Sequence, residues 1–286
     1  MLSPNGTIAA AVEAGRRDLL GVSPSPGLDA RVLAGHVLGM DASALIAYGE
    51  NLMDAVKRRQ LATLVARRKA GEPVAYIVGS KEFCRLRLAV DRRVLVPRPE
   101  TEELVERIIK EWHGRAIDAL DLGTGSGAIA CALADAMPKA QVLATDISHD
   151  ALEVARGNAK LHQIEKNIRF LESDLLEGLT SGFVADVIVS NPPYIADGEI
   201  AKLPKEVRDF EPVRALAAGE DGLKVIRRLV MTARRFLSSS GFMALEIGAG
   251  QRPAVEDIFV QQGWDVVEVV KDLQGHERVI VAQPKK

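Results

Sequence analysis

The sequence predicts an α/β protein: a doubly wound, Rossmann-like sheet of seven strands, preceded by a small helical bundle and a linking β-hairpin. Three observations support this prediction. From residue 116 onward, short apolar runs alternate with helical patterns, which is typical of a mostly parallel sheet with helices on both faces. A glycine-rich run, residues 121–128, follows the first of these apolar runs. Before residue 80, Ala- and Leu-rich segments favour helices.

Residues 1–79 are expected to form the helical domain. Proline and glycine interrupt short stretches of helical periodicity there. In Asp29–Leu38, apolar residues at 33, 34, 37 and 38 share one helical face, and residues 54–69 repeat the pattern. Short helices of this kind bury their apolar faces by assembling into a bundle.

Residues 80–96 are expected to form the linking β-hairpin. Leu86, Leu88 and Val90 alternate with other residues, and an apolar run at 94–96 follows the polar triplet 91–93. The run 97–99, Pro-Arg-Pro, ends this segment, and a helix is expected from about Glu100.

Residues 97–286 are expected to form the α/β domain. The predicted strands are 116–122, 141–146, 167–171, 186–190, 242–247, 265–270 and 278–282, with helices near 128–136, 150–162, 222–237 and 251–262. The connection between the last two strands is too short for a crossover helix, so these strands are predicted to be antiparallel to each other.

The amino-acid composition argues against several classes of partner and cofactor. The 286 residues carry 37 Lys and Arg and 39 Asp and Glu, a formal charge of −2, whereas a protein that binds bare nucleic acid is usually far more basic. Two cysteines cannot provide a four-ligand zinc site, and no metal is expected. The sequence shows no long apolar stretch and no signal-peptide pattern, so a cytoplasmic protein is expected, with no membrane partner.

The glycine run suits a nucleoside cofactor. Its three glycines allow a sharp turn and close approach of a ligand, and Asp146, nineteen residues after Gly127, could accept hydrogen bonds from both ribose hydroxyls. The spacing from Gly123 to Ala128 also fits NAD, so the loop alone leaves two cofactors open. Asp121 and the additional Gly127 favour S-adenosylmethionine, because its cationic methionine end prefers a nearby acid.

A second acidic residue, Asp174, follows the third predicted strand of this domain. Ligands of doubly wound sheets lie beyond the carboxyl ends of the strands, which places Asp174 where it could meet an adenine amine. A turn or helix cap is the alternative reading.

The tetrad Asn191-Pro192-Pro193-Tyr194 directly follows a predicted buried strand. Two prolines fix φ and remove two N–H donors, leaving the carbonyls of Asn191 and Pro192 as free acceptors. The Asn191 side chain adds an acceptor, and the Tyr194 ring offers a flat face. Such a site suits a planar –NH₂ group, whose nitrogen it would aim at a methyl carbon. With the glycine loop, the tetrad indicates a methyltransferase acting on an amide or amine nitrogen.

Three other readings stay open at this point. Methylation of the adenine amine in nucleic acid uses similar tetrads but predicts a basic groove. A nicotinamide-dependent oxidoreductase leaves residues 191–194 unexplained. A noncatalytic module that docks on the translation machinery predicts a degraded cofactor loop, whereas the loop here is intact.

The sequence resembles the release-factor glutamine methyltransferases, the HemK-like group. The likeness rests on Pro73–Gly79, on residues 81–83, on 94–102 with its Arg-Pro-Glu-Thr run, on the glycine loop and on Asn191–Tyr194; it continues through 206–212, 219–222 and 245–248. It implies a class I methyltransferase fold. It also implies that S-adenosylmethionine methylates the side-chain amide of the glutamine in the Gly-Gly-Gln motif of class I peptide chain release factors.

The resemblance also implies site residues. The cofactor would be held by Asp121, Gly123, Thr124, Gly125, Ser126, Gly127, Asp146, Asp174, Leu175 and Asn191. The substrate amide would be bound at Asn191 within the tetrad that Pro192, Pro193 and Tyr194 complete, and Arg98, Glu100 and Thr101 are expected to line the pocket. Residues 1–79 would help to dock the release factor, and the enzyme is expected to be monomeric.

A related group methylates a glutamine of a ribosomal protein. That group carries a different sequence after the Pro-Arg pair, so Glu100-Thr101-Glu102 favours the release-factor group here.

Overall fold

The computed structural model describes residues 6–180, 182–272 and 274–285, and within them the chain divides into two compact units. The first unit comprises the chain up to Ser80 together with Pro204–Phe210, and the second comprises Lys81–Leu203 and Glu211 onward. The helical unit therefore includes a short segment that lies far downstream in the sequence, which residue patterns before position 80 did not indicate.

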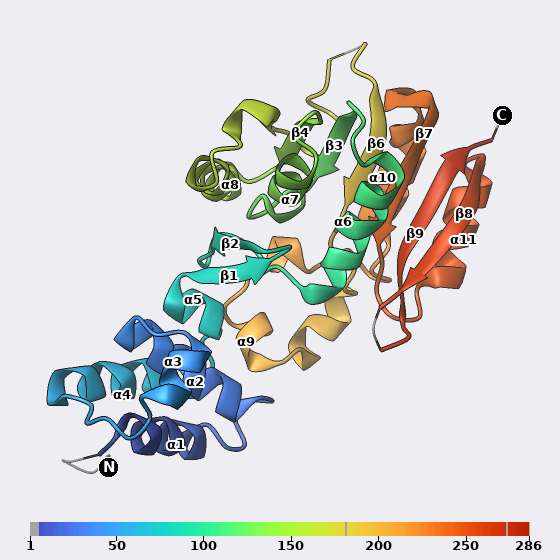
Figure 1. Cartoon of the computed structure of the whole chain (residues 1–286). Helices are drawn as coiled ribbons and strands as arrows, with labels where there is room; N and C mark the ends of the chain where they lie inside the picture. Colours follow the sequence, from blue (N-terminus) through green and yellow to red (C-terminus); the bar gives the residue numbers. More distant parts are fainter. Residues whose placement is uncertain (1–5, 181, 273, 286) are drawn as a thin grey trace. The chain divides into compact units, whose positions relative to one another are not determined.

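The first unit is a bundle of short helices (Figure 1). Its helices are α1 (Ile8–Asp18), α2 (Pro26–Leu38), α3 (Ala42–Ala47), α4 (Ala55–Lys69), α5 (Val74–Val78) and α9 (Lys205–Arg208). Polar caps define where α1, α3 and α4 begin: at the start of α4, for example, Asp54 accepts hydrogen bonds from the main-chain N–H groups of Val56 and Lys57. The core contains Leu19, Leu33 and Leu61, each at most 1% exposed.

A buried arginine joins the downstream segment to this bundle. Arg68 of α4 donates to Asp29 of α2 at 2.6 Å and forms an ion pair with Glu206 of α9 at 2.5 Å. Because the Arg68 side chain is only 4% exposed, its charge needs such partners, and the two acids supply them.

A two-stranded sheet of β1 (Ser80–Phe83) and β2 (Leu86–Ala89) comes next, and all of it except Ser80 belongs to the second unit. The predicted hairpin exists, but its turn falls at Cys84 and Arg85, both of which adopt positive φ (46° and 68°). The apolar run at 94–96 lies outside any strand. Asp91 accounts for part of this, because its side chain and main-chain carbonyl accept hydrogen bonds from Arg93 and Val94 in a local turn.

The main sheet has seven strands in the order β5-β4-β3-β6-β7-β9-β8 (Figure 1). The strands are β3 (Asp118–Leu122), β4 (Gln141–Asp146), β5 (Ile168–Glu172), β6 (Ala185–Ser190), β7 (Leu237–Glu246), β8 (Trp264–Lys271) and β9 (Glu277–Pro284). The pairs from β5 through β7 are parallel, and β9 runs antiparallel to both β7 and β8. The predicted Rossmann-like topology, with an antiparallel last pair, is confirmed.

Helices cover both faces of this sheet. They are α6 (Pro99–Trp112), α7 (Ala128–Ala136), α8 (His149–Leu161), α10 (Lys224–Ala233) and α11 (Arg252–Gln261). Alternate strand residues face opposite cores: Val187 and Val189 pack with α6 and α7, whereas Ile188 packs with α10 and α11. Two-sided burial explains the nearly continuous apolar runs of the central strands.

Helix α6 brings residues from the start of the second unit to the sheet. Pro99 occupies its first turn, where a missing N–H costs nothing, and Glu100 and Glu102 favour its positive N-terminal end. Leu104, Val105 and Ile108 are fully buried on its inner face.

Among the residues that the structure describes, none of the helices has the length and apolar character of a membrane span.

Candidate active site

Polar groups follow or end several parallel strands at the same edge of the sheet. The glycine loop follows β3, Asp146 ends β4, Asn191 follows β6 and Glu246 ends β7. Strand β3 pairs with β4 on one side and β6 on the other, so the chain changes direction along the sheet here. Ligands of doubly wound sheets bind outside such a switch point.

The glycine loop is shaped for close approach of a ligand. Gly123, Gly125 and Gly127 adopt φ values of 73°, 56° and 79°, which side chains other than glycine rarely tolerate. A Cβ atom added at Gly123 or Gly125 would meet no described atom within 4 Å and would enter open space. At Gly127 it would lie 3.0 Å from the Cβ of Ala155, so this glycine is needed for packing against α8.

Asp121 holds the loop from beneath. Its Oδ2 accepts hydrogen bonds from the Thr124 hydroxyl at 2.6 Å and from the main-chain N–H of Ala130 at 3.2 Å. Its Oδ1 is buried and has no hydrogen-bond partner among the described residues. Burial raises the pKa of this carboxyl to about 7. The fully buried Asp121 therefore acts through the loop, whose conformation its two hydrogen bonds hold.

Asp146 is arranged as an acceptor at the end of β4. It receives hydrogen bonds from the main-chain N–H groups of Gly125 at 2.9 Å and Ser148 at 2.8 Å, and burial raises its pKa. The hydrogen bond to Gly125 ties this carboxylate to the glycine loop. The loop and the acid thus form one arrangement, and its binding of a nucleoside stays a prediction.

Asp174 and Leu175 lie in the turn after β5. The Asp174 carboxylate is 37% exposed and pairs with Arg228 of α10 at 2.9 Å. Leu175 has a φ of 54°, and its carbonyl accepts a hydrogen bond from the Ser173 hydroxyl at 3.0 Å. The structure thus gives Asp174 a cationic partner that the sequence did not indicate; its contact with an adenine amine stays a prediction.

Asn191 is anchored through one end of its amide. Its Nδ2 donates a hydrogen bond to the Thr101 hydroxyl at 2.9 Å, and that hydroxyl donates to Glu246 Oε2 at 2.6 Å. Asn191 Oδ1 accepts no hydrogen bond from the described part of the chain. The structure thus brings together two residues that the sequence assigned to the pocket, and it presents the Asn191 carbonyl oxygen as an available acceptor.

The rest of the tetrad is held rigidly. Pro192 is buried, and no donor from a described residue meets its main-chain carbonyl. Tyr194 packs against the α10–α11 side of the sheet; its main-chain carbonyl accepts from the Gln251 side chain at 2.9 Å, and its hydroxyl lies 3.4 Å from Glu246 Oε1. Burial raises the pKa of this phenol.

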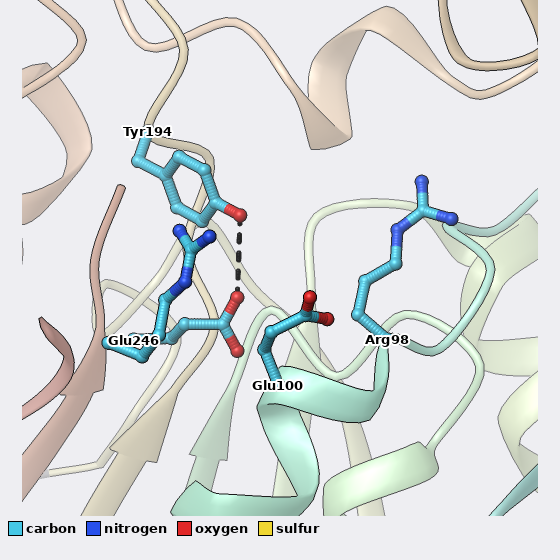
Figure 2. A pocket seen from close by; sticks show the side chains of 5 residues that line it. Arg98, Glu100, Tyr194 and Glu246 are labelled. Atoms are coloured by element: carbon cyan, nitrogen blue, oxygen red, sulfur yellow. Dashed lines mark hydrogen bonds between the residues drawn. The ribbon is translucent and has the colours of Figure 1, made fainter. Parts of the chain in front are cut away.

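A charged cavity of about 170 Å³ lies beside the tetrad. It is lined by Arg98, Glu100, Tyr194, Glu246 and Arg278. Figure 2 shows Glu100 and Arg98 rising from the start of α6, opposite Tyr194 and Glu246. Arg98 also donates to both oxygens of the buried Glu211 at 2.7 Å, which fixes that guanidinium at the rim of the cavity.

Glu246 was not among the predicted site residues. It is 1% exposed, and burial raises its pKa to about 7, opposed by the Thr101 hydrogen bond and the positive charge of Arg278. One signal in the sequence could have identified it: a single acid interrupts the otherwise apolar run 242–247. Only the pairing of Ser190 with Leu245, which puts the ends of β6 and β7 side by side, shows that this acid approaches Asn191.

Asn158 is a second residue that the sequence analysis missed. This fully buried side chain of α8 donates to the carbonyls of Ser126 and Ala89 and accepts from the main-chain N–H of Ala89. It therefore fixes the glycine loop to strand β2. Nothing local distinguishes Asn158 from a surface asparagine, since its two partner residues lie far away in the sequence.

The fold and the two strand-end motifs define this unit as a methyltransferase of the Rossmann-like class. Residues 10–79 match the family described as the PrmC N-terminal domain, and residues 99–206 match the methyltransferase small domain. Among solved structures, a methyltransferase from Pyrococcus furiosus shares the fold with a TM-score of 0.54 at 19% identity, over 79% of this chain and 98% of that one.

Two curated relatives give the family. The release factor glutamine methyltransferase of Salmonella typhimurium is 42% identical over 90% of this chain and 92% of its own length. That of Rhodopirellula baltica is 40% identical over 91% of this chain and 90% of its own length. The chain belongs to the release factor glutamine methyltransferase family, as the sequence motifs had indicated.

Proposed function

We propose that this enzyme transfers a methyl group from S-adenosylmethionine to the side-chain amide nitrogen of the glutamine in the Gly-Gly-Gln motif of class I peptide chain release factors. The observation that carries this proposal is the anchored Asn191 amide, whose Oδ1 is an available acceptor next to the glycine loop. Membership of the family supports the choice of substrate.

The residues present suit the cofactor. The open space above Gly123 and Gly125 would admit its methionine part, and Asp146 would accept hydrogen bonds from its ribose. Asp121, Thr124, Ser126 and Gly127 would shape the loop around it, and Asp174 and Leu175 would lie toward the adenine. When bound, the cofactor supplies a methyl group on a positively charged sulfur, which leaves as a neutral thioether.

The chain's own residues then orient the acceptor amide. Asn191 Oδ1 and the Pro192 carbonyl accept the two hydrogens of the glutamine –NH₂ group, which fixes its nitrogen for in-line attack. As the new C–N bond forms, the nitrogen becomes positive, and these hydrogen bonds strengthen. The nitrogen then loses one proton, which is acidic at that stage, so no strong general base is needed.

We also propose that residues 1–79 dock the release factor. The match to the PrmC N-terminal domain supports this role. The unit also exposes large apolar side chains that a partner could cover, among them Ile46 at 79% and Leu52 at 75%. We also propose a cytoplasmic location, because the proposed substrate acts in translation.

The test uses purified enzyme, labelled S-adenosylmethionine and a class I release factor. We expect label on the wild-type factor and none on a factor whose motif glutamine is replaced by alanine. Equal label on both factors would show that a different atom is methylated. A ribosomal protein and an adenine-rich nucleic acid, each offered in place of the factor, test the two alternative acceptors.

A further inference from the structure

A buried chain of hydrogen bonds reaches the Asn191 amide from two other elements. Thr101 lies in the first turn of α6 and is 4% exposed, and Glu246 ends β7 at 1% exposed. The chain runs from Asn191 Nδ2 to Thr101 Oγ1 (2.9 Å) and on to Glu246 Oε2 (2.6 Å). Glu246 thus lies one side chain away from the group that binds substrate.

The direction of each hydrogen bond follows from the chemistry of its partners. An ionised carboxylate only accepts, so Glu246 requires the single proton of the Thr101 hydroxyl. The Thr101 oxygen can then only accept, and it must face the –NH₂ end of Asn191. The opposite end of the amide, Oδ1, is left to accept from a ligand.

We propose, on the basis of the function proposed above, that Glu246 and Thr101 are positioning residues that set which end of the Asn191 amide faces the substrate. Without them, an asparagine amide can rotate by 180° and present its –NH₂ group instead. Two –NH₂ groups would then face each other, and the substrate nitrogen would lose one of its acceptors.

The surroundings of Glu246 make this control sensitive to protonation. The groups that face it are Thr101, Tyr194, Arg278 and Glu100; the Tyr194 hydroxyl at 3.4 Å is also a donor, which suits an accepting carboxylate. Burial raises the pKa of Glu246 to about 7. When Glu246 is protonated, it can donate a hydrogen bond to the Thr101 oxygen. The Thr101 hydroxyl is then free to donate to Asn191, which favours the rotated amide with Oδ1 facing Thr101 and –NH₂ facing the substrate.

The decisive experiment compares Thr101→Val with Thr101→Ser in the full chain. Valine keeps the shape of the side chain but lacks the hydroxyl, whereas serine keeps the hydroxyl. For Thr101→Val we expect kcat for release-factor methylation to fall about 100-fold, the effect of a misplaced catalytic group. The Kd for S-adenosylmethionine should stay within about threefold, and Thr101→Ser should recover most of kcat.

Thr232→Val is the matched control. The hydroxyl of Thr232 donates only within α10, to the carbonyls of Arg228 and Leu229, so its loss should leave kcat unchanged.

A second readout of the positioning role is the pH profile of kcat. Wild-type kcat should rise with pH through an apparent pKa of about 7, and Glu246→Gln, which cannot ionise, should remove that rise.

The outcomes separate the two proposals. A wild-type enzyme that methylates no release factor overturns the proposed function. A wild-type enzyme that is active, with equal kcat for the valine and serine variants, overturns the positioning role alone. The positioning role is also overturned if Thr101→Val loses cofactor binding as strongly as it loses kcat, or if the variant unfolds. A structural role of Thr101 would then explain the loss of kcat.

Discussion

Two buried carboxylates at the carboxyl edge of the sheet have similar electrostatics but different neighbours. Burial raises the pKa values of both Asp121 and Glu246 to about 7. Asp121 binds Thr124 and the N–H of Ala130, groups of its own loop and helix. Glu246 binds Thr101, which binds Asn191. A perturbed pKa therefore marks this edge of the sheet, and only the hydrogen-bond partners show which part of the reaction each acid would serve.

The largest effect is expected from Asn191→Ala, which removes the residue through which Glu246 is proposed to act. Kcat should fall about 1,000-fold, as for loss of one preorganised group in a transition-state site, with the Kd for S-adenosylmethionine little changed. Single-turnover methylation and calorimetric binding measure the two quantities. The double variant with Thr101→Val should be no slower than Asn191→Ala alone, and additive losses would contradict the proposed order of contacts.

Asp121→Asn tests the other acid. The amide oxygen can replace Oδ2 and accept from both Thr124 and the N–H of Ala130, but its –NH₂ group then replaces Oδ1 and is buried without an acceptor, which costs about 1–3 kcal/mol of unfolding free energy. We expect about tenfold weaker cofactor binding and nearly normal kcat at saturating cofactor. Urea unfolding and cofactor titration provide the measurements; a kcat loss as large as that of Asn191→Ala would remove the distinction between the two acids.

The pH dependence of stability offers a third comparison. A carboxyl whose pKa is raised on folding favours the folded state below its unfolded pKa, about 4.5, and this contribution is lost as pH rises through about 7. Glu246→Gln removes the charge, so at pH 8 it should raise the unfolding free energy by an amount on the order of 2 kcal/mol. At pH 5 the variant and the wild type should differ little. Equal stability of the two proteins at both pH values would contradict the raised pKa.

The smallest effect is expected from Tyr194→Phe. Its hydroxyl lies 3.4 Å from Glu246, a long hydrogen bond, whereas Thr101 lies at 2.6 Å from the same carboxylate. Kcat should therefore fall by no more than about threefold, while Thr101→Val has a far larger effect. Steady-state kinetics of the two variants in parallel make the comparison, and the reverse order would assign the control of Asn191 to Tyr194.

Much of the architecture could be predicted from local patterns. The order of strands and helices after residue 116 follows from buried apolar runs, and the strand bounds differ from prediction mainly at their ends, as in β7, which begins at Leu237 rather than at 242. The hairpin was predicted, yet its strands are 80–83 and 86–89, because Cys84 and Arg85 accept the positive φ values of a tight turn. Which residues form the turn depends on tertiary packing around it, and the local sequence does not show that packing.

By itself, the sequence determined the fold class, the family, the glycine loop and the Asn-Pro-Pro-Tyr tetrad, because each is written in consecutive residues with strong conformational preferences. Only the tertiary structure showed that Glu206 pairs with the buried Arg68, that Asn158 fixes the glycine loop, and that Glu246 reaches Asn191 through Thr101. These partners are separated by tens of residues or more. Their pairing is decided by strand order and helix placement, which no local stretch of sequence encodes.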